Sequence, residues 1–178
     1  MSDFRVLIVP GLHGSEPEHW QSRWQRLYPA FERVEQADWE TPDLNVWSDQ
    51  LLHVLRRSPK PTLVVAHSFG CLATVRAAGY GAPNLAAALL VAPADPDKFG
   101  LSASLGARPL AKPSLLVGST NDPWMACERA SFWAKMWGTD FLCAGDLGHI
   151  NAESGIGDWL FGLSLLERLR FATAILYS

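Results

Sequence analysis

Three polar residues stand where three predicted strands end. Ser68, Asp122 and His149 each follow a short apolar run. A serine hydroxyl is a weak nucleophile until a histidine accepts its proton, and the histidine needs a carboxylate that orients its ring. The residue types and their order along the chain therefore predict acyl-transfer chemistry. In this interpretation Ser68 is the nucleophile, His149 the general base and Asp122 the acid.

The serine lies in a motif that turns a strand sharply into a helix. The segment Ala66-His67-Ser68-Phe69-Gly70 matches G-x-S-x-G, with alanine in place of the first glycine. Such an elbow pushes the serine out over the carboxyl edge of a sheet, and the small neighbours let strand and helix approach closely. The alternative is that Ser68 only caps the following helix, because serine is a preferred N-cap residue.

The two partners also have alternative roles. Asp122 precedes Pro123 and would suit a helix N-cap with proline at the first helical position. Asp95, which follows the fourth predicted strand, is the second candidate for the acid. Asp146 ranks third, because it is too close in sequence to His149 to reach back easily. His149 could also be a histidine of a surface loop.

Acyl transfer also needs hydrogen-bond donors for the oxyanion that develops on the substrate. One expected donor is the backbone N–H of Phe69, directly after the nucleophile. The second is expected in the glycine-rich turn 11–14 after the first strand, where the N–H of Leu12 is the first choice. The turn could instead be a plain glycine turn or a phosphate loop, but neither nucleotide-binding glycine pattern is present.

The surrounding pattern alternates strands with helices. Apolar runs predict strands at 4–9, 31–35, 63–66, 85–91, 113–118 and 141–144, and helical spacing predicts helices at 20–27, 45–57, 70–78, 125–137 and 156–171. This alternation predicts an α/β fold, a six-stranded, mostly parallel sheet with helices on both faces, in one domain spanning 1–178. Parallel strands end at one edge, where ligands bind in open sheets of this class.

Two further features concern the surroundings of this edge. The connection 92–112 is long, rich in Pro, Gly and Ser, and without periodicity, so we expect the most mobile flap there. Eight tryptophans are many for 178 residues. They could be ordinary packing residues, or some could line an apolar substrate cleft. Trp124, next to Asp122, is the first candidate. Ser15 is expected to cap the first helix.

Composition excludes several classes of function. The chain is 48% hydrophobic and 19% charged with a net charge of −3, so a nucleic-acid partner is not expected. The apolar run 6–9 near the N-terminus is too short for a signal-peptide core, and no stretch has the length of a membrane span. Three scattered cysteines do not predict a disulfide framework. We therefore expect a cytoplasmic protein. No cofactor or metal is expected, since His13 and His19 lack metal-ligand spacing and His19 is expected on a helix surface.

At this point the chain resembles the small serine hydrolases of the α/β-hydrolase superfamily, the group that includes bacterial YdeN-like proteins and the retinoblastoma-binding protein nine hydrolase. The similarity runs over nearly the whole chain. It is carried by several separate blocks in the same order, namely Pro10-Gly11, His19-Trp20-Gln21-Ser22-Arg23-Trp24, 65–70, Val91-Ala92-Pro93-Ala94-Asp95, Ser119-Thr120-Asn121-Asp122-Pro123 and 148–155.

The resemblance implies a compact hydrolase core without a cap domain, with Ser68 as nucleophile, His149 as base and Asp122 as acid. It does not supply a substrate. The expected activity is that of an esterase on a small ester or, less readily, an amide. An acyltransferase would use the same residues, and a protein-interaction module on an inherited hydrolase fold is the alternative from another class, since a fold does not fix a function.

Overall fold

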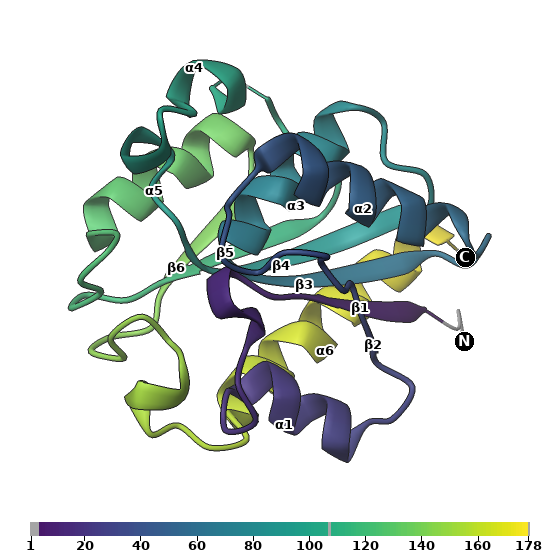
Figure 1. Ribbon diagram of the computed structural model, residues 1–178. Helices are drawn as coiled ribbons and strands as arrows, with labels where there is room; N and C mark the ends of the chain where they lie inside the picture. The colour runs from purple at the N-terminus through teal and green to yellow at the C-terminus, as the bar shows by residue number, and fades with distance from the viewer. Residues whose placement is uncertain (1–3, 107, 178) are drawn as a thin grey trace.

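The protein is built around one parallel sheet (Figure 1). The computed structural model describes residues 4–106 and 108–177. In this part of the chain the sheet has six strands in the order β2-β1-β3-β4-β5-β6, and every neighbouring pair is parallel. The strands are β1 (Arg5–Val9), β2 (Glu32–Arg33), β3 (Thr62–Ser68), β4 (Leu85–Pro93), β5 (Ser114–Gly118) and β6 (Asp140–Cys143).

Helices cover both faces of this sheet (Figure 1). They are α1 (Trp20–Leu27), α2 (Leu44–Arg56), α3 (Phe69–Gly79), α4 (Ser102–Leu105), α5 (Cys127–Trp137) and α6 (Leu160–Ala174). The helices α2, α3, α4 and α5 lie on one face, and α1 and α6 lie on the other. The predicted three-layer α/β-hydrolase architecture is therefore confirmed, with no cap domain evident among the described residues.

The composition of the strands explains why they lie inside. All nine residues of β4 are buried, and all are apolar. A strand covered by helices on both faces needs apolar side chains at every position rather than an alternating pattern. The short edge strand β2 instead has a polar sequence, Glu32-Arg33, and its side chains are exposed or half-buried. The predicted strand 31–35 is therefore shortened to two residues, which pair only with Leu7 and Ile8 of β1.

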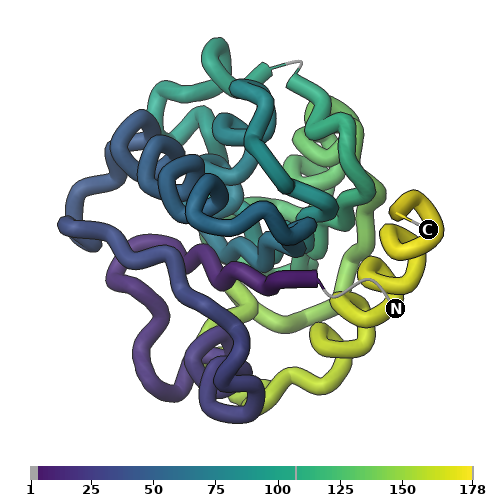
Figure 2. Tube along the Cα trace, turned by 90° about the vertical axis from the view of Figure 1, so that its right-hand side faces the viewer, coloured from purple at the N-terminus to yellow at the C-terminus, as the bar shows by residue number. Residues whose placement is uncertain are grey.

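The core is divided by the sheet into two clusters. On the α2–α3 side, Trp47 and Phe69 are among the largest buried side chains, and their ring centroids lie 5.2 Å apart. On the α1–α6 side, Trp20, Trp24 and Trp159 pack against one another. The first helix and the segment before the last helix therefore depend on each other for burial. In Figure 2 the start of β1 and the end of α6 also lie side by side.

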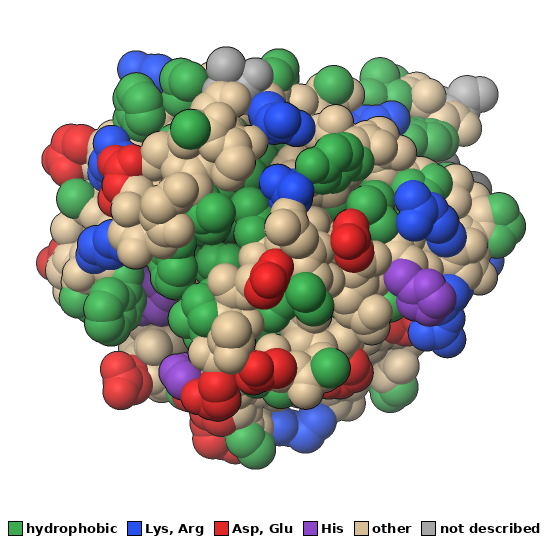
Figure 3. Space-filling model, turned by 45° about the horizontal axis from the view of Figure 1, so that its top comes forward, with side chains coloured by type: hydrophobic (Ala, Val, Ile, Leu, Met, Phe, Trp, Pro, Cys, Tyr) green, Lys and Arg blue, Asp and Glu red, His purple; other side chains and the backbone are tan. Residues whose placement is uncertain are grey.

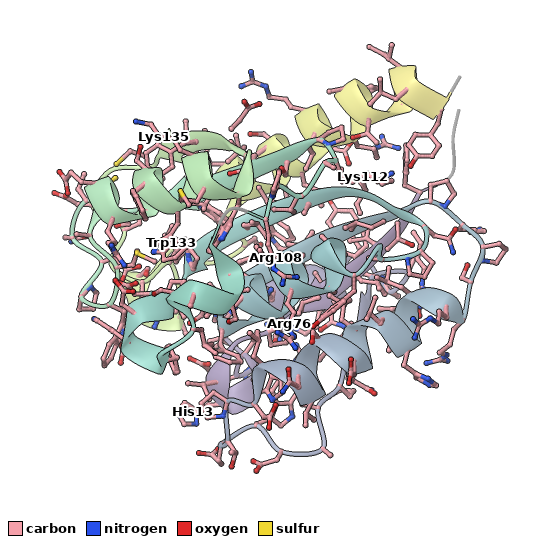
Figure 4. All side chains as sticks on the ribbon, turned by 90° about the horizontal axis from the view of Figure 1, so that it is seen from above. His13, Arg76, Arg108, Lys112, Trp133 and Lys135 are labelled. Carbon is pink, nitrogen blue, oxygen red and sulfur yellow. The ribbon has the colours of Figure 1, made fainter. Side chains whose placement is uncertain are left out.

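The connection 92–112 differs from the expected flap. It contains a short 3₁₀ helix, Pro96–Phe99, and the helix α4, neither of which is long enough to show periodicity in the sequence. The indole N–H of Trp137 donates to the carbonyl of Leu105, 3.0 Å away. Arg108, after α4, lies beside Arg76 of α3 in Figure 4, and both guanidinium groups stack on Tyr80. These contacts hold the segment against α3 and α5. They therefore do not support the expectation that the whole connection is a mobile flap.

Two helix boundaries also differ from the predictions. His19, not Ser15, is the N-cap of α1, and its Nδ1 accepts the backbone N–H of Gln21. The last helix begins at Leu160 rather than near residue 156, because Trp159 has a left-handed backbone with φ of 40°. Across the described residues, none of these helices combines the length and the apolar character that crossing a membrane requires.

Candidate active site

The carboxyl ends of the strands bring the three predicted residues to one edge of the sheet. Ser68 ends β3, Asp122 lies in the turn after β5, and His149 lies in the loop after β6. Because all these strands are parallel, the loops that follow them lie along the same edge. The sequence positions of Ser68 and His149 are 81 residues apart, yet their side chains are in hydrogen-bond contact.

The elbow around Ser68 has the strained geometry that its motif predicts. Ser68 has φ of 52° and ψ of −123°, a conformation that a non-glycine residue adopts only under constraint. A Cβ atom on Gly70 would lie 2.4 Å from the carbonyl oxygens of Val9 and Pro10, so only glycine fits there. Ser68 occupies the N-cap position of α3, but its side chain caps no backbone N–H. The hydroxyl is thus free for another partner.

That partner is His149. Its Nε2 lies 3.0 Å from Oγ of Ser68, and its Nδ1 lies 2.9 Å and 3.1 Å from the two carboxylate oxygens of Asp122. The carboxylate can only accept, so Nδ1 carries the proton and Nε2 accepts the hydroxyl proton of Ser68. The side chains of Asp122 and His149 are 1% and 12% exposed. The three residues therefore form one hydrogen-bonded chain that is shielded from water at its acidic end.

The competing carboxylates have other partners. Asp95 faces Arg129, whose Nε lies 3.1 Å from one carboxylate oxygen, and this guanidinium also contacts Asp97. Asp146 accepts the hydroxyl of Thr120. Asp122 does not cap α5, which begins five residues later, but its Oδ1 accepts the backbone N–H of Trp124 at 2.9 Å. This turn fixes the carboxylate toward His149, so the geometry favours Asp122 as the acid.

The two expected oxyanion donors lie on adjacent loops. Phe69 is the first residue of α3, and the N–H groups of a helical first turn have no partner within the helix. A Cβ atom on Gly11 would lie 3.3 Å from the nitrogen of Phe69, so the turn after β1 runs directly beside it. In that turn the N–H of His13 donates to Trp39 and that of Gly14 to Gly11. Leu12, which lines the pocket, is therefore the favoured second donor.

Two further histidines lie next to the candidate base, and sequence reasoning did not identify their role. His67 is 5% exposed and His19 is 2% exposed. The expected surface position of His19 is therefore wrong, because α1 packs its N-terminal end under the His149 loop. Burial lowers the pKa of His19 to about 3, helped by the nearby charges of Arg33 and His149. Burial likewise lowers the pKa of His67 well below its usual value. Both rings are neutral at pH 7.

A pocket opens over Ser68. Its volume is about 520 Å³, within the range of about 300–1,000 Å³ that is typical of small-molecule sites. Leu12, Phe99 and Trp124 supply apolar lining, while Glu16 and Glu153 supply carboxylates. Figure 3 shows a hollow on this side of the molecule, with hydrophobic side chains on its walls and histidine side chains at the surface nearby. Ser68 is itself one of the lining residues of this pocket.

His13 is a peripheral member of this lining. It projects from the turn after β1 toward solvent, as Figure 4 shows, and its Nδ1 lies 3.0 Å from the carboxylate of Glu40. No group of three or more His, Cys, Asp or Glu side chains within residues 4–106 and 108–177 has an arrangement that could hold a metal ion.

Comparisons with known proteins find hydrolases of similar structure. A YdeN-like hydrolase from Pectobacterium atrosepticum is 37% identical, with a TM-score of 0.93, over 96% of this chain and 92% of that one. The YdeN gene product of Bacillus subtilis is 20% identical, with a TM-score of 0.77, over 94% of this chain and 98% of that one. Est1E from Butyrivibrio proteoclasticus, solved with ferulic acid bound, is 13% identical, with a TM-score of 0.70, over 95% of this chain and 90% of that one.

The last two similarities concern the fold alone, whereas the first extends to the sequence. No match is found among curated proteins. The model of the serine hydrolase family matches residues 6–168, nearly the whole chain. The protein therefore belongs to the serine hydrolase family, within the α/β-hydrolase fold.

Proposed function

We propose that the protein is a carboxylesterase-type acyl hydrolase that acts on a small ester and less readily on an amide. The observation that carries this proposal is the hydrogen-bonded chain from Oγ of Ser68 through the ring of His149 to the carboxylate of Asp122, with distances of 3.0 Å and 2.9 Å. Such a chain activates a hydroxyl for attack on a carbonyl carbon, which is the chemistry of acyl transfer.

In the acylation step Oγ of Ser68 attacks the ester carbonyl while Nε2 of His149 takes the hydroxyl proton. The carbonyl oxygen becomes an oxyanion, which the N–H groups of Phe69 and Leu12 stabilise. A single donor of this kind contributes about 2.7–4 kcal/mol to transition-state stabilisation in a well-studied case. Asp122 stabilises the imidazolium that forms. His149 then gives its proton to the leaving alcohol, and an acyl-enzyme remains on Ser68.

In the deacylation step the same groups act on water. Nε2 of His149 accepts a proton from a water molecule that enters the open pocket, and the hydroxide formed attacks the acyl carbonyl. The tetrahedral intermediate collapses when His149 returns the proton to Oγ of Ser68. The products are a carboxylic acid and the free enzyme. An alcohol or amine that enters in place of water would make the protein an acyltransferase.

The size of the pocket supports a small substrate. About 520 Å³ accommodates the acyl and alcohol parts of a drug-sized ester at most. Trp124 is 58% exposed and lines this pocket, which is unusual because most other tryptophans of the chain are buried. We therefore assign to Trp124 the contact with the apolar part of the substrate.

The test is labelling with a fluorophosphonate probe, followed by peptide mapping and a screen of p-nitrophenyl esters. We expect the label on Ser68, its loss in Ser68→Ala, and ester hydrolysis that disappears in the same variant. Folded wild-type protein without label and without hydrolysis would contradict the proposal and favour the protein-interaction module. Label with ester turnover that rises only when an alcohol or amine is added would identify an acyltransferase instead.

A further inference from the structure

The residue before the nucleophile makes a specific contact with the candidate base. Nε2 of His67 lies 2.9 Å from the backbone carbonyl oxygen of His149. A carbonyl oxygen can only accept a hydrogen bond, so Nε2 of His67 carries a proton and donates it. The two rings also pack edge to face, with centroids 4.9 Å apart. His67 therefore contacts both the backbone and the side chain of the residue that must accept the proton of Ser68.

The charge state of His67 follows from its burial. Burial, together with the neighbouring rings of His19 and His149, lowers the pKa of His67 far below its usual value, so the ring is neutral. A neutral imidazole has one protonated nitrogen, and the bond to His149 assigns the proton to Nε2. The tautomer is thus fixed, with Nδ1 unprotonated. This matters because a charged ring at this distance would oppose the positive charge that His149 gains in each catalytic step.

His19 packs against His67 and also has a fixed tautomer. Its Nδ1 accepts the backbone N–H of Gln21 at 3.2 Å, so the proton of its neutral ring is on Nε2. That nitrogen is buried and has no hydrogen-bond partner among the described residues. The ring of His19 packs edge to face on His67 with centroids 4.6 Å apart. His19 therefore packs on His67, and His67 packs on the candidate base His149. Both His19 and His67 are neutral and have fixed tautomers.

The loop that carries His149 needs such support. The next residue, Ile150, has φ of 47°, a strained value for a β-branched side chain. The indole N–H of Trp20 holds the carbonyl of Ile150 at 2.7 Å. Two consecutive carbonyls of this strained loop are therefore held by ring N–H groups, one from β3 and one from α1. Asp122 orients the imidazole of His149, but these two bonds hold the backbone from which it projects.

We infer that His67 is a positioning residue of the catalytic site: its neutral Nε2–H holds the backbone of His149 so that the imidazole stays within hydrogen-bond distance of Ser68. The role of His67 is exerted through His149 rather than on the substrate. This inference rests on the proposed function, because it assumes that His149 is the base. A displacement of about 1 Å in such a group can lower a rate by about 100-fold.

The test compares two substitutions of similar length. In His67→Gln the side-chain amide can place an N–H donor near the position of Nε2, whereas His67→Met offers no donor. The readouts are the rate constant for fluorophosphonate labelling of Ser68, and kcat and KM for p-nitrophenyl acetate. We expect His67→Met to lower the labelling rate and kcat by about 10- to 100-fold with little change in KM. We expect His67→Gln to recover most of this loss.

The control is Leu63→Ala, a core substitution on the same strand. Leu63 is fully buried and lies near the opposite end of β3 from Ser68. It should lower the thermal unfolding temperature while leaving the labelling rate of the folded protein unchanged. Equal labelling rates for wild type, His67→Met and His67→Gln would overturn the positioning role, and equal losses in both variants would do the same. Wild-type protein that does not label would instead overturn the proposed function.

A measurement on the wild-type protein keeps the inference testable even where His67→Met does not fold. The ¹⁵N chemical shifts of histidine rings distinguish the two neutral tautomers and the charged form. We expect His67 to show a protonated Nε2 and an unprotonated Nδ1 at every pH from 5 to 9. A proton on Nδ1, or a titration of His67 within this range, would overturn the inference.

Discussion

A Cβ atom on Gly11 would lie 2.7 Å from the Cβ atom of Ser68. The turn after β1, which carries the candidate donor Leu12, therefore packs closely against the elbow after β3, which carries Phe69. We expect Gly11→Ala to force the two loops apart. Overpacking of this kind costs about 1–3 kcal/mol of stability, and fluorophosphonate labelling should fall by at least tenfold.

The matched control for this substitution is Gly81→Ala. No atom lies within 4 Å of the added Cβ, so the cost comes only from the positive φ of 72°. Such strain amounts to about 1–2 kcal/mol, and the labelling rate should not change. Urea unfolding and labelling rates of both variants check the pair. Normal labelling in Gly11→Ala would show that the spacing of the two loops is not critical.

The identity of the acid can be tested with two isosteric substitutions. Asp122→Asn removes the charge that stabilises the imidazolium and favours the wrong tautomer of His149. We expect kcat/KM to fall on the order of 10³- to 10⁴-fold, as in other triads. Asp95→Asn weakens the pairing with Arg129 and should change kcat/KM by less than tenfold, because Asp95 does not contact His149. A larger loss in Asp95→Asn than in Asp122→Asn would reverse the assignment.

The position of Trp124 in the pocket lining gives a prediction about substrate preference. Trp124 is 58% exposed, and the ammonium group of Lys98 lies 5.5 Å from its ring centroid. Trp124→Ala should raise KM for butyrate and octanoate p-nitrophenyl esters relative to the acetate ester. Phe171→Ala, which removes an exposed ring of α6 that does not line the pocket, should leave this order unchanged. An unchanged order of esters in Trp124→Ala would remove its assigned contact with the substrate.

The buried histidines predict how stability depends on pH. The ring of His19 in the unfolded chain takes up a proton near pH 6.5, whereas in the folded protein it does so only near pH 3. Between these values the unfolded state binds more protons, so stability falls as the pH is lowered. In the middle of this range, His19 changes the free energy of unfolding by about 1.4 kcal/mol per pH unit. His67 acts in the same direction.

The contribution of His19 to the pH dependence of stability can be measured by urea unfolding of wild type and His19→Asn at pH 7, 6 and 5. Asparagine can still cap α1 through its side-chain oxygen but does not titrate. We expect a shallower loss of stability with falling pH in His19→Asn than in wild type. Replacing His53, which is exposed on α2, by asparagine should leave the pH dependence as in wild type. Identical slopes for wild type and His19→Asn would show that His19 is protonated in the folded state.

The three thiols should differ in reactivity. Burial raises the pKa of the Cys127 thiol to about 12, with a further contribution from the neighbouring Cys143, and burial also raises the pKa of Cys71. Because only the thiolate reacts, both should be poorly alkylated at pH 8. Cys143 is exposed, and iodoacetamide followed by mass spectrometry should find it modified first. Modification of Cys71 before Cys143 would contradict the burial described here.

The parts of the site that the sequence predicted are those with a local cause. The elbow could be predicted because an apolar run, a serine between small residues and a helical stripe are contiguous. Asp122 and His149 could be predicted because each directly follows a strand, and the parallel sheet then brings them together. The fold class follows from the same alternation of strands and helices.

The parts that were wrong have causes that no local pattern shows. His19 stands in a polar stretch, and only the packing of α1 under the loop after β6 buries it. Ser15 looked like a helix cap, but its hydroxyl donates to the side chain of Gln21 instead. The helix α4 has four residues, which is too short for a periodic pattern. Contacts between segments far apart in the chain leave no trace in the local sequence.

The pairing of α1 with the last segment of the chain has a consequence for biosynthesis. The indole of Trp24 donates to the carbonyl of Asp158, 134 residues further on, and Trp20 is bound to Ile150. On a translating ribosome the first helix would therefore keep its tryptophan face uncovered until the segment 150–158 has been synthesised. The candidate nucleophile Ser68 is likewise synthesised 81 residues before His149, so the hydrogen bond between them forms only after this late segment has emerged.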